Sequence, residues 1–371
     1  MEFSAKKSEL LKELDLAQGV VEKKATIPVL SNFLLEVAES YVSLSATDLE
    51  LGVTSKCPAR VKKGGSSTVP ARRLVEIVRA LPEADVRFKL LENQWMQVTC
   101  ERSSFKLVGM ARDNFPALPS LPEPLAAVSS GPVATLIRRT AFGVSNEDSR
   151  YTLNGALLIL KPETITMVAT DGHRLAMAER DTPVEGLSNE LRILVPRKAM
   201  GELEKLLGEA PPDAKLEISK DDSHLFFSLA DRVLIARLLT GQFPNYEAVL
   251  PKETQHTVEL EKEAFAAALR RVALLADERS RAVRLRVSEG QVELFSTSGE
   301  YGEAQEAIDA DYRGEALEIG FNYQYLLDFL DVLGQGGKVR LELQDEQSAG
   351  QLRPVDDELG RYRYVVMPMR I

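Results

Sequence analysis

The segment Thr170-Asp171-Gly172-His173-Arg174 brings a carboxylate, an imidazole and a guanidinium close together in the chain. An acid beside a histidine suits general acid–base work, and with Asp48 these groups could serve a metal-dependent hydrolase or nuclease. The chain has only three histidines, and they show no metal-ligand spacing such as HExxH. The sequence also lacks a P-loop, a GxSxG elbow and a CxxC pair. An isolated Asp-Gly-His is more often a turn, so we expect no catalytic residue, metal or cofactor and keep hydrolysis as a competing hypothesis.

Short motifs recur at a spacing of about a third of the chain. Val69-Pro70 and Val195-Pro196 each open an amphipathic segment, and Ile319-Gly320 opens a third. Ala46-Thr47-Asp48 returns as Ala169-Thr170-Asp171. Solenoid repeats span only about 20–50 residues, so this longer period predicts three tandem copies of one ordinary domain.

Length and composition agree with three soluble domains. The 371 residues allow two or three domains, which we place at residues 1–125, 126–254 and 255–371, with a proline-dense linker at 116–124. An apolar fraction of 44% is ample for ordinary cores, and no stretch of the sequence reaches the length of a membrane span. Two cysteines make no disulfide framework and favour a reducing cytoplasm.

The periodicity of each copy predicts two helices and about eight strands. We expect helices over residues 4–19 and 72–80, 133–143 and 198–208, and 262–276 and 323–333, the first with Ser4 as its N-cap. Alternating apolar residues predict antiparallel strands between them. The fold class is therefore α+β, with the helices packed on one face of one sheet in each copy. Joining these copies edge to edge and closing them into a ring would remove the exposed sheet edges.

These residues resemble the bacterial DNA polymerase III beta subunit, the DNA sliding clamp. The resemblance covers nearly the whole chain and rests on segments that occur in the family's order: Val69-Pro70-Ala71-Arg72, Tyr151-Thr152-Leu153-Asn154-Gly155, the segment 170–176, Phe243-Pro244-Asn245-Tyr246 and the terminal 364–370. It implies a head-to-tail homodimer of three-domain subunits. Such a six-domain ring encloses duplex DNA, with helices lining the hole and sheets outside.

A DNA channel requires local positive charge, although the chain carries a net charge of −10. Five of the six expected helices carry groups of lysine and arginine, whereas the charges of the last are Asp328 and Asp331. Contacts from such helices meet phosphates and carry no sequence information. The helices and the resemblance together give these expected DNA contacts: Lys24, Arg72, Arg73, Arg79, Arg138, Arg139, Arg150, Tyr151, Arg197 and Lys198. Glu147 and Thr152 depart from the family's pattern, which weakens the contact expected from their loop.

The resemblance also implies a hydrophobic groove that takes short linear peptides. A methionine-rich surface suits several partners, Gly172 leaves room for a ligand backbone, and Arg174 could hydrogen-bond it. The expected groove residues are Leu153, Thr170, Gly172, His173, Arg174, Leu175, Pro244, Val249, Val366, Met367, Pro368, Met369 and Arg370. Ala248 replaces an arginine that the family often has, so the rim should be less basic.

In the family, the third domain of one subunit meets the first domain of the next. Leu274 and Leu275 would supply the apolar contact, unless they are core residues of their own domain. The residues expected at this joint are Arg73, Arg102, Phe105, Leu107, Leu274, Leu275, Glu303 and Glu306. The arginines would pair with the glutamates across the joint, adding about 0–1 kcal/mol for each exposed pair.

The resulting hypothesis is a non-enzymatic processivity clamp in the cytoplasm, associated with the nucleoid. Its expected partners are double-stranded DNA, a second copy of itself, the clamp loader, the DNA polymerase III alpha subunit and other proteins that carry a clamp-binding motif. No membrane partner is expected. The alternative within the same family is a specialised second clamp for repair or drug resistance, with a restricted set of partners.

Overall fold

The structure is a computed structural model that describes residues 1–22, 26–147 and 149–370. The chain forms two compact units. The first unit comprises Met1–Gly131 and Lys198–Leu238, and the second comprises Pro132–Arg197 and Leu239–Ile371. Lys24, one of the expected DNA contacts, lies outside the described residues.

Each of the six α-helices that the structure describes begins at the residue directly after a strand. The pairs are β1 (Glu2–Lys6) and α1 (Lys7–Gln18), β6 (Gly65–Pro70) and α2 (Ala71–Ala80), β10 (Ala126–Ser129) and α3 (Ser130–Thr140), β14 (Leu191–Pro196) and α4 (Arg197–Gly208), β18 (His256–Glu261) and α5 (Lys262–Val272), and β22 (Leu317–Asn322) and α6 (Tyr323–Asp331). The repeated element is thus a strand–helix pair that occurs twice in each sequence copy.

The first helix starts later than expected. Ser4 lies within β1, where Phe3 and Ala5 are buried on either side of it, and it is not the N-cap of a helix. Side chains alternate between the two faces of a strand, and this short alternation is the signal that the predicted helix overlooked. Among the described residues, none of the helices combines the length and hydropathy that crossing a bilayer requires.

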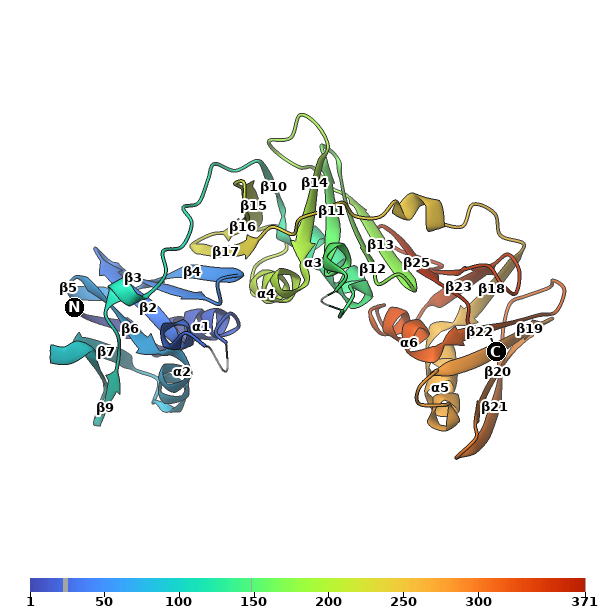
Figure 1. Ribbon diagram of the computed structural model, residues 1–371, viewed down its shortest axis with the longest axis horizontal. Helices are drawn as coiled ribbons and strands as arrows, with labels where there is room; N and C mark the ends of the chain where they lie inside the picture. Colours follow the sequence, from blue (N-terminus) through green and yellow to red (C-terminus); the bar gives the residue numbers. More distant parts are fainter. Residues whose placement is uncertain (23–25, 148, 371) are drawn as a thin grey trace. The chain divides into compact units, whose positions relative to one another are not determined.

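The first unit contains two antiparallel sheets and the helices α1 and α2, which pack against each other (Figure 1). The five-stranded sheet has the order β5 (Arg60–Lys63), β1, β7 (Asp85–Leu90), β8 (Trp95–Cys100) and β9 (Ser103–Val108). The eight-stranded sheet has the order β10, β15 (Lys215–Lys220), β16 (His224–Leu229), β17 (Arg232–Arg237), β4 (Leu51–Pro58), β3 (Tyr41–Thr47), β2 (Asn32–Ala38) and β6.

The second unit repeats this plan with α5 and α6 in contact (Figure 1). Its eight-stranded sheet has the order β14, β11 (Gly155–Lys161), β12 (Thr164–Thr170), β13 (Arg174–Asp181), β25 (Arg361–Val366), β24 (Gly350–Pro354), β23 (Lys338–Leu343) and β18. Its four-stranded sheet has the order β21 (Gly302–Asp309), β20 (Gln291–Ser298), β19 (Ala282–Ser288) and β22.

The sequence copies join through continuous sheets. In the first unit β17 pairs with β4 from Arg232↔Ser55 to Ala236↔Leu51, and in the second unit β13 pairs with β25. The expected edge-to-edge joining is therefore present as ladders of backbone hydrogen bonds. The expectation of one sheet per copy was wrong, because each copy contributes strands to two sheets.

Candidate peptide-binding groove

The Thr170–Arg174 segment folds as a tight turn between β12 and β13. Asp171 Oδ1 accepts hydrogen bonds from the backbone N–H groups of His173 (2.9 Å) and Arg174 (3.1 Å). Thr170 Oγ1 accepts from Gly172 N–H and donates to the Arg174 carbonyl at 2.6 Å. Gly172 has a φ of +90°, which favours glycine. The polar side chains of this motif shape the turn, as such residues do in many loops.

The equivalent segment of the first copy forms the same turn. Asp48 Oδ1 accepts from the N–H groups of Glu50 (2.9 Å) and Leu51 (2.6 Å), and Thr47 Oγ1 donates to the Leu51 carbonyl at 2.6 Å. The repeated Ala-Thr-Asp motif therefore encodes a repeated turn, which accounts for its presence without catalysis. Among the residues that the structure describes, no three acidic, histidine or cysteine side chains are grouped to hold a metal ion.

Beside this turn the second unit has a pocket of about 150 Å³. Nine of the thirteen expected groove residues line it: Leu153, Thr170, Gly172, His173, Arg174, Leu175, Pro244, Val249 and Met367. Asn245, Tyr246 and Val365 complete the lining. The structure thus brings together segments that lie far apart in the sequence, and most of the surface is apolar.

Strand register explains the floor of the pocket. Thr170 pairs with Leu175, and Leu175 pairs with Val365, so the three side chains form one row across β12, β13 and β25. Leu175 and Val365 belong to a buried cluster with Tyr246, which the connecting segment after β17 contributes. The pocket lies where this segment covers the sheet without filling the space at its margin.

The same register corrects one expected lining residue. Val366 pairs with Arg174 in the row next to Leu175 and Val365, and consecutive side chains in a strand point to opposite faces. Val366 is fully buried and does not line the pocket, whereas Val365 does. Sequence alternation could have identified Val365, because Tyr362, Tyr364 and Val366 form the opposite set.

Arg174 does not fit the expected role of hydrogen-bonding a ligand backbone. Its side chain is 10% exposed, and its Nε donates to Asp171 Oδ2 at 3.0 Å. One terminal nitrogen donates to the Asp328 carboxylate on α6, and the other donates to the Phe142 carbonyl at 2.7 Å. The guanidinium also stacks on the rings of Phe142 and Tyr325. Because these acceptors occupy the donors of its guanidinium, Arg174 holds in place the turn that forms the pocket wall.

Two lining residues that the sequence did not single out come from the segment over the sheet. Tyr246 is largely buried, and this burial raises the pKa of its phenol, which therefore stays neutral. Asn245 directly precedes it. Both belong to the Phe-Pro-Asn-Tyr motif already recognised in the sequence, so the signal was present but was credited to Pro244 alone.

The chain after β25 meets the pocket at one residue. Met367 is half-exposed, lines the pocket and donates its backbone N–H to the His173 carbonyl at 2.9 Å. Met369 instead donates to the Gly320 carbonyl at 2.8 Å. Pro368, Met369 and Arg370 do not line this pocket, because the chain turns toward β22 at that point.

The expected DNA contacts fall into different environments. Arg138, Arg197 and Tyr151 are exposed. Exposed arginines on α2 are paired with carboxylates: Arg72 and Arg73 with Glu76, and Arg79 with Asp15. On α4, Lys198 is paired with Glu50 and Asp48. Exposed pairs of this kind are worth about 0–1 kcal/mol, so a phosphate could replace the carboxylate at small cost.

Arg139 cannot contact DNA in this fold. It is buried, and its guanidinium forms a two-pronged pair with Asp357 at 2.7 and 2.8 Å while stacking on the Tyr362 ring. Its neighbour Arg138 faces solvent because adjacent positions on a helix point in different directions. Arg150 pairs with Glu147 at 3.0 Å and donates to the Asp171 carbonyl at 2.8 Å, so Glu147 partly neutralises it.

The residues expected at the subunit joint lie on open sheet edges or carry exposed apolar side chains. Phe105 and Leu107 lie on β9, the edge of the five-stranded sheet, and Glu303 and Glu306 lie on β21, the edge of the four-stranded sheet. Leu274 is 79% exposed, so it is not a core residue of its own domain. Leu275 is partly exposed.

Two of the four charged residues expected to pair across the joint have partners within the chain. Glu306 binds Arg271, with Arg271 Nε donating to Oε2 at 2.9 Å. Arg73 donates to Glu76 Oε2 at 2.8 Å. Arg102 and Glu303 are exposed, and the structure shows no ion pair for either among the described residues. Arg102 and Glu303 are thus the better candidates for pairing with another subunit.

Three tandem two-helix α+β domains, an apolar pocket at a turn, and open edges at β9 and β21 are the features of a clamp protein. The family models of the DNA polymerase III beta subunit match the N-terminal domain at residues 1–119, the central domain at 127–245 and the C-terminal domain at 247–370. The chain therefore belongs to the DNA polymerase III beta subunit family. The predicted α+β fold of three tandem clamp domains is confirmed.

The chain aligns with individual relatives over the full length of both proteins. The chain is 37% identical to the beta sliding clamp of Pseudomonas putida and 34% identical to that of Escherichia coli K12, covering all of each chain. The crystal structure of the Pseudomonas aeruginosa DNA polymerase III subunit beta matches with a TM-score of 0.93 at 36% identity, again over all of both chains. These similarities confirm the prediction of a sliding clamp, and they do not favour the specialised second clamp.

Proposed function

We propose that the chain is the sliding clamp that keeps the replicative DNA polymerase on its template, and that two copies close head to tail into a six-domain ring around duplex DNA. The observation that carries this proposal is the succession of three family domains over nearly the whole chain. We place the domains at residues 1–125, 126–254 and 255–371. The clamp is a processivity factor that performs no catalysis.

The groove supports the part of the proposal that concerns partners. Its small apolar cavity suits one or two apolar side chains of an extended peptide, and the exposed ring of His173 and the thioether of Met367 stand at its margin. A flexible methionine adapts to peptides of different shape. The DNA polymerase III alpha subunit, the clamp loader and other proteins with a clamp-binding motif are the proposed ligands.

Sheet edges support the proposed dimer. An open edge carries unpaired backbone N–H and C=O groups that another strand can satisfy. Antiparallel pairing of β9 in one subunit with β21 in the next would extend both sheets, and Leu274 next to β21 would gain an apolar partner in Phe105. The leucine contributes more than the exposed ion pairs, which are individually weak.

Weak contacts with phosphates suit a protein that slides. The exposed cations on the helices give affinity that does not depend on sequence and that falls as salt rises. Retention then comes from topology, because a closed ring leaves DNA only at an end. The acidic surface elsewhere repels DNA outside the ring. The proposed location is the cytoplasm, at the nucleoid.

Loading on circular DNA tests the proposal. The protein is loaded on nicked circular DNA with a clamp loader and ATP, separated by gel filtration, and the circle is then cut once. We expect the protein to stay on the circle and to leave the linear product. Retention on linear DNA without blocked ends would contradict encirclement and would indicate direct binding.

A further inference from the structure

The five-stranded sheet of the first unit has one face in the core and one face in solvent. Phe3, Phe88 and Val98 are buried on the core side. The other face, called here the outer face, is made by the alternate residues of β5, β1, β7, β8 and β9: Arg60, Lys62, Lys63, Glu2, Ser4, Asp85, Arg87, Lys89, Trp95, Gln97, Thr99, Ser104, Lys106 and Val108.

The outer face has a net positive charge, whereas the chain as a whole is negative. This face carries seven lysines and arginines, counting Lys6 at the end of β1, and two carboxylates, Glu2 and Asp85, in a protein whose net charge is −10. Lys6 is paired with Glu9 on α1 at 3.7 Å. Glu2 pairs with Lys62 at 2.9 Å and Asp85 with Arg60 at 3.5 Å. The other four cations, Lys63, Arg87, Lys89 and Lys106, form no ion pair within 4 Å among the described residues. Lys89 nevertheless lies opposite Glu2, whose pKa is lowered by the hydrogen bond from Lys62 and also by the charge of Lys89.

Strand register arranges three of these cations in a line. Lys63 pairs with Glu2, Glu2 with Lys89, Lys89 with Gln97, and Gln97 with Lys106. Neighbouring strands lie about 4.8 Å apart, so the three lysines follow one another at roughly 10 Å across the sheet. A line of cations at this spacing can follow the phosphates of a flexible strand.

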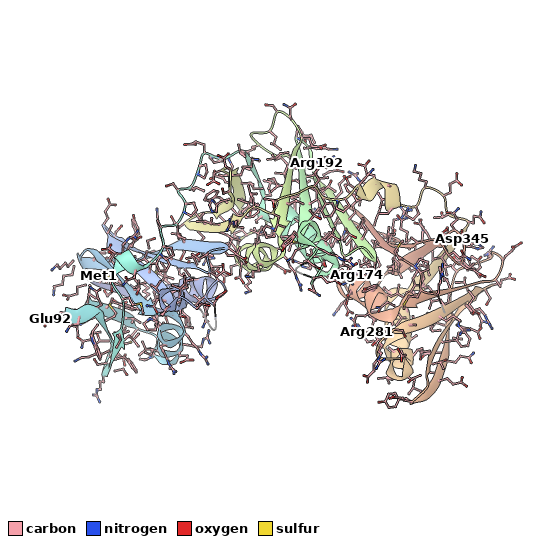
Figure 2. All side chains as sticks on the ribbon, viewed as in Figure 1. Met1, Glu92, Arg174, Arg192, Arg281 and Asp345 are labelled. Atoms are coloured by element: carbon pink, nitrogen blue, oxygen red, sulfur yellow. The ribbon has the colours of Figure 1, made fainter. Side chains whose placement is uncertain are left out.

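An aromatic ring stands beside this line. Trp95 is the only tryptophan of the chain and is 40% exposed. Together with Lys89, Lys106, Leu90, Leu91 and Glu92 it lines an open depression of about 730 Å³ (Glu92 is labelled in Figure 2). The indole stands opposite Val108 on β9, and the exposed part of its ring is open to a stacking partner.

We propose that the outer face binds single-stranded nucleic acid, with phosphates on Lys63, Lys89 and Lys106 and a base stacked on Trp95. Unstacked bases and a flexible phosphate chain match an aromatic ring within a row of cations. Duplex DNA hides its base faces, so it would use the lysines alone. This site is separate from the groove and from the helices, and it shares only the strand β9 with the edge proposed for the subunit joint.

Tryptophan fluorescence tests the site directly, because the chain's single indole lies in it. A short oligothymidylate is titrated into the full-length protein at several salt concentrations. We expect saturable quenching, with a slope of log affinity against log salt of about −2, since each phosphate contact of a single strand contributes about −0.7. The double variant Lys63→Gln with Lys89→Gln, whose residues lie away from the β9 edge, should weaken binding at least tenfold.

The matched control changes two exposed lysines of the first unit that lie off the outer face. Lys56→Gln with Lys220→Gln removes the same charge and should leave quenching unchanged. Both double variants should still load on circular DNA, which separates this test from that of the clamp. Anisotropy that shows oligothymidylate binding without quenching would overturn the proposal. Quenching by polyglutamate but not by oligothymidylate would also overturn it, in favour of an acidic polypeptide.

Discussion

The guanidinium of Arg174 on β13 binds the carboxylate of Asp328 on α6, although 154 positions separate them in the chain. Arg174 belongs to the central family domain and Asp328 to the C-terminal one. The ion pair thus joins two domains beneath the turn that forms the pocket wall. The acidic character of the sixth helix, which departs from the basic pattern of the others, has a structural reason here.

Replacing Arg174 should damage stability as well as peptide binding. Arg174→Ala leaves Asp328 and Asp171 without their cation in a largely buried place, which typically costs about 3–5 kcal/mol. We expect the free energy of unfolding to fall by that order in denaturant titration. Asp328→Asn keeps a hydrogen-bond acceptor and should cost less. Equal stability of wild type and Arg174→Ala would show that this network contributes nothing.

The groove can be tested without that complication at Val249. Its side chain is 47% exposed and lines the pocket, whereas Leu359 in the same unit is 45% exposed and does not line it. Val249→Ala should weaken a polymerase-derived peptide by about threefold to tenfold, the effect of a lost apolar contact worth roughly 1 kcal/mol. Leu359→Ala should leave the affinity unchanged in isothermal titration calorimetry. Equal effects of the two changes would place the peptide elsewhere.

The neighbours Arg138 and Arg139 should respond in opposite ways. Arg138→Gln removes an exposed cation and should reduce the slope of log affinity against log salt for duplex DNA by about 0.9, with no loss of stability. Arg139→Gln breaks the buried pair with Asp357 and should cost about 3–5 kcal/mol in stability. Salt titration and thermal melting measure the two effects, and an unchanged melting temperature of Arg139→Gln would contradict the burial argument.

Leu274→Ala with Leu275→Ala should give folded monomers. Since Leu274 is 79% exposed, truncation removes little from its own domain, and the melting temperature of the monomer should change by only a few degrees. Sedimentation at micromolar concentration would show the change of mass. A dimer that survives this substitution would place the joint away from β21.

Both cysteines should resist thiol reagents in the folded protein. Burial raises the pKa of the Cys57 thiol to about 12, and burial also raises that of Cys100. At pH 8 neither forms the reactive thiolate, and both should react once denaturant unfolds the chain. The unfolded thiol ionises from about pH 9, so the contribution of Cys57 to stability is complete below pH 9 and falls as the pH rises toward 12. Rapid labelling at pH 8 without denaturant would contradict this expectation.

Local sequence patterns predicted the fold better than they predicted which individual side chains are exposed. The Ala-Thr-Asp repeat specified the same turn twice, because a short polar side chain can bond its own backbone wherever that motif stands. The strand β1 was not predicted, and part of it was assigned to the first helix, because only the alternation of the buried Phe3 and Ala5 indicates a strand there. Helical periodicity in the following residues is stronger and longer than that signal.

Side-chain environments were harder to predict, because they depend on residues that are distant in the chain. No sequence pattern near Arg139 indicates that it pairs with Asp357, and none near Arg174 indicates that it pairs with Asp328. Charge alone therefore grouped Arg138 with Arg139 as DNA contacts. Pocket residues were predicted more successfully, since the family motifs place them in short segments that the fold brings together, although strand alternation separates Val365 from Val366.

The pairing of β17 with β4 and of β13 with β25 has a consequence for truncated proteins. Cutting the chain at a boundary between sequence repeats would remove the neighbour of an interior strand. The backbone groups of that strand would then form an exposed sheet edge that can pair with another chain. Isolated repeats should therefore aggregate or pair with one another. Each compact unit takes two separate stretches of the chain, residues 1–131 with 198–238 and residues 132–197 with 239–371, so no single cut releases either unit whole.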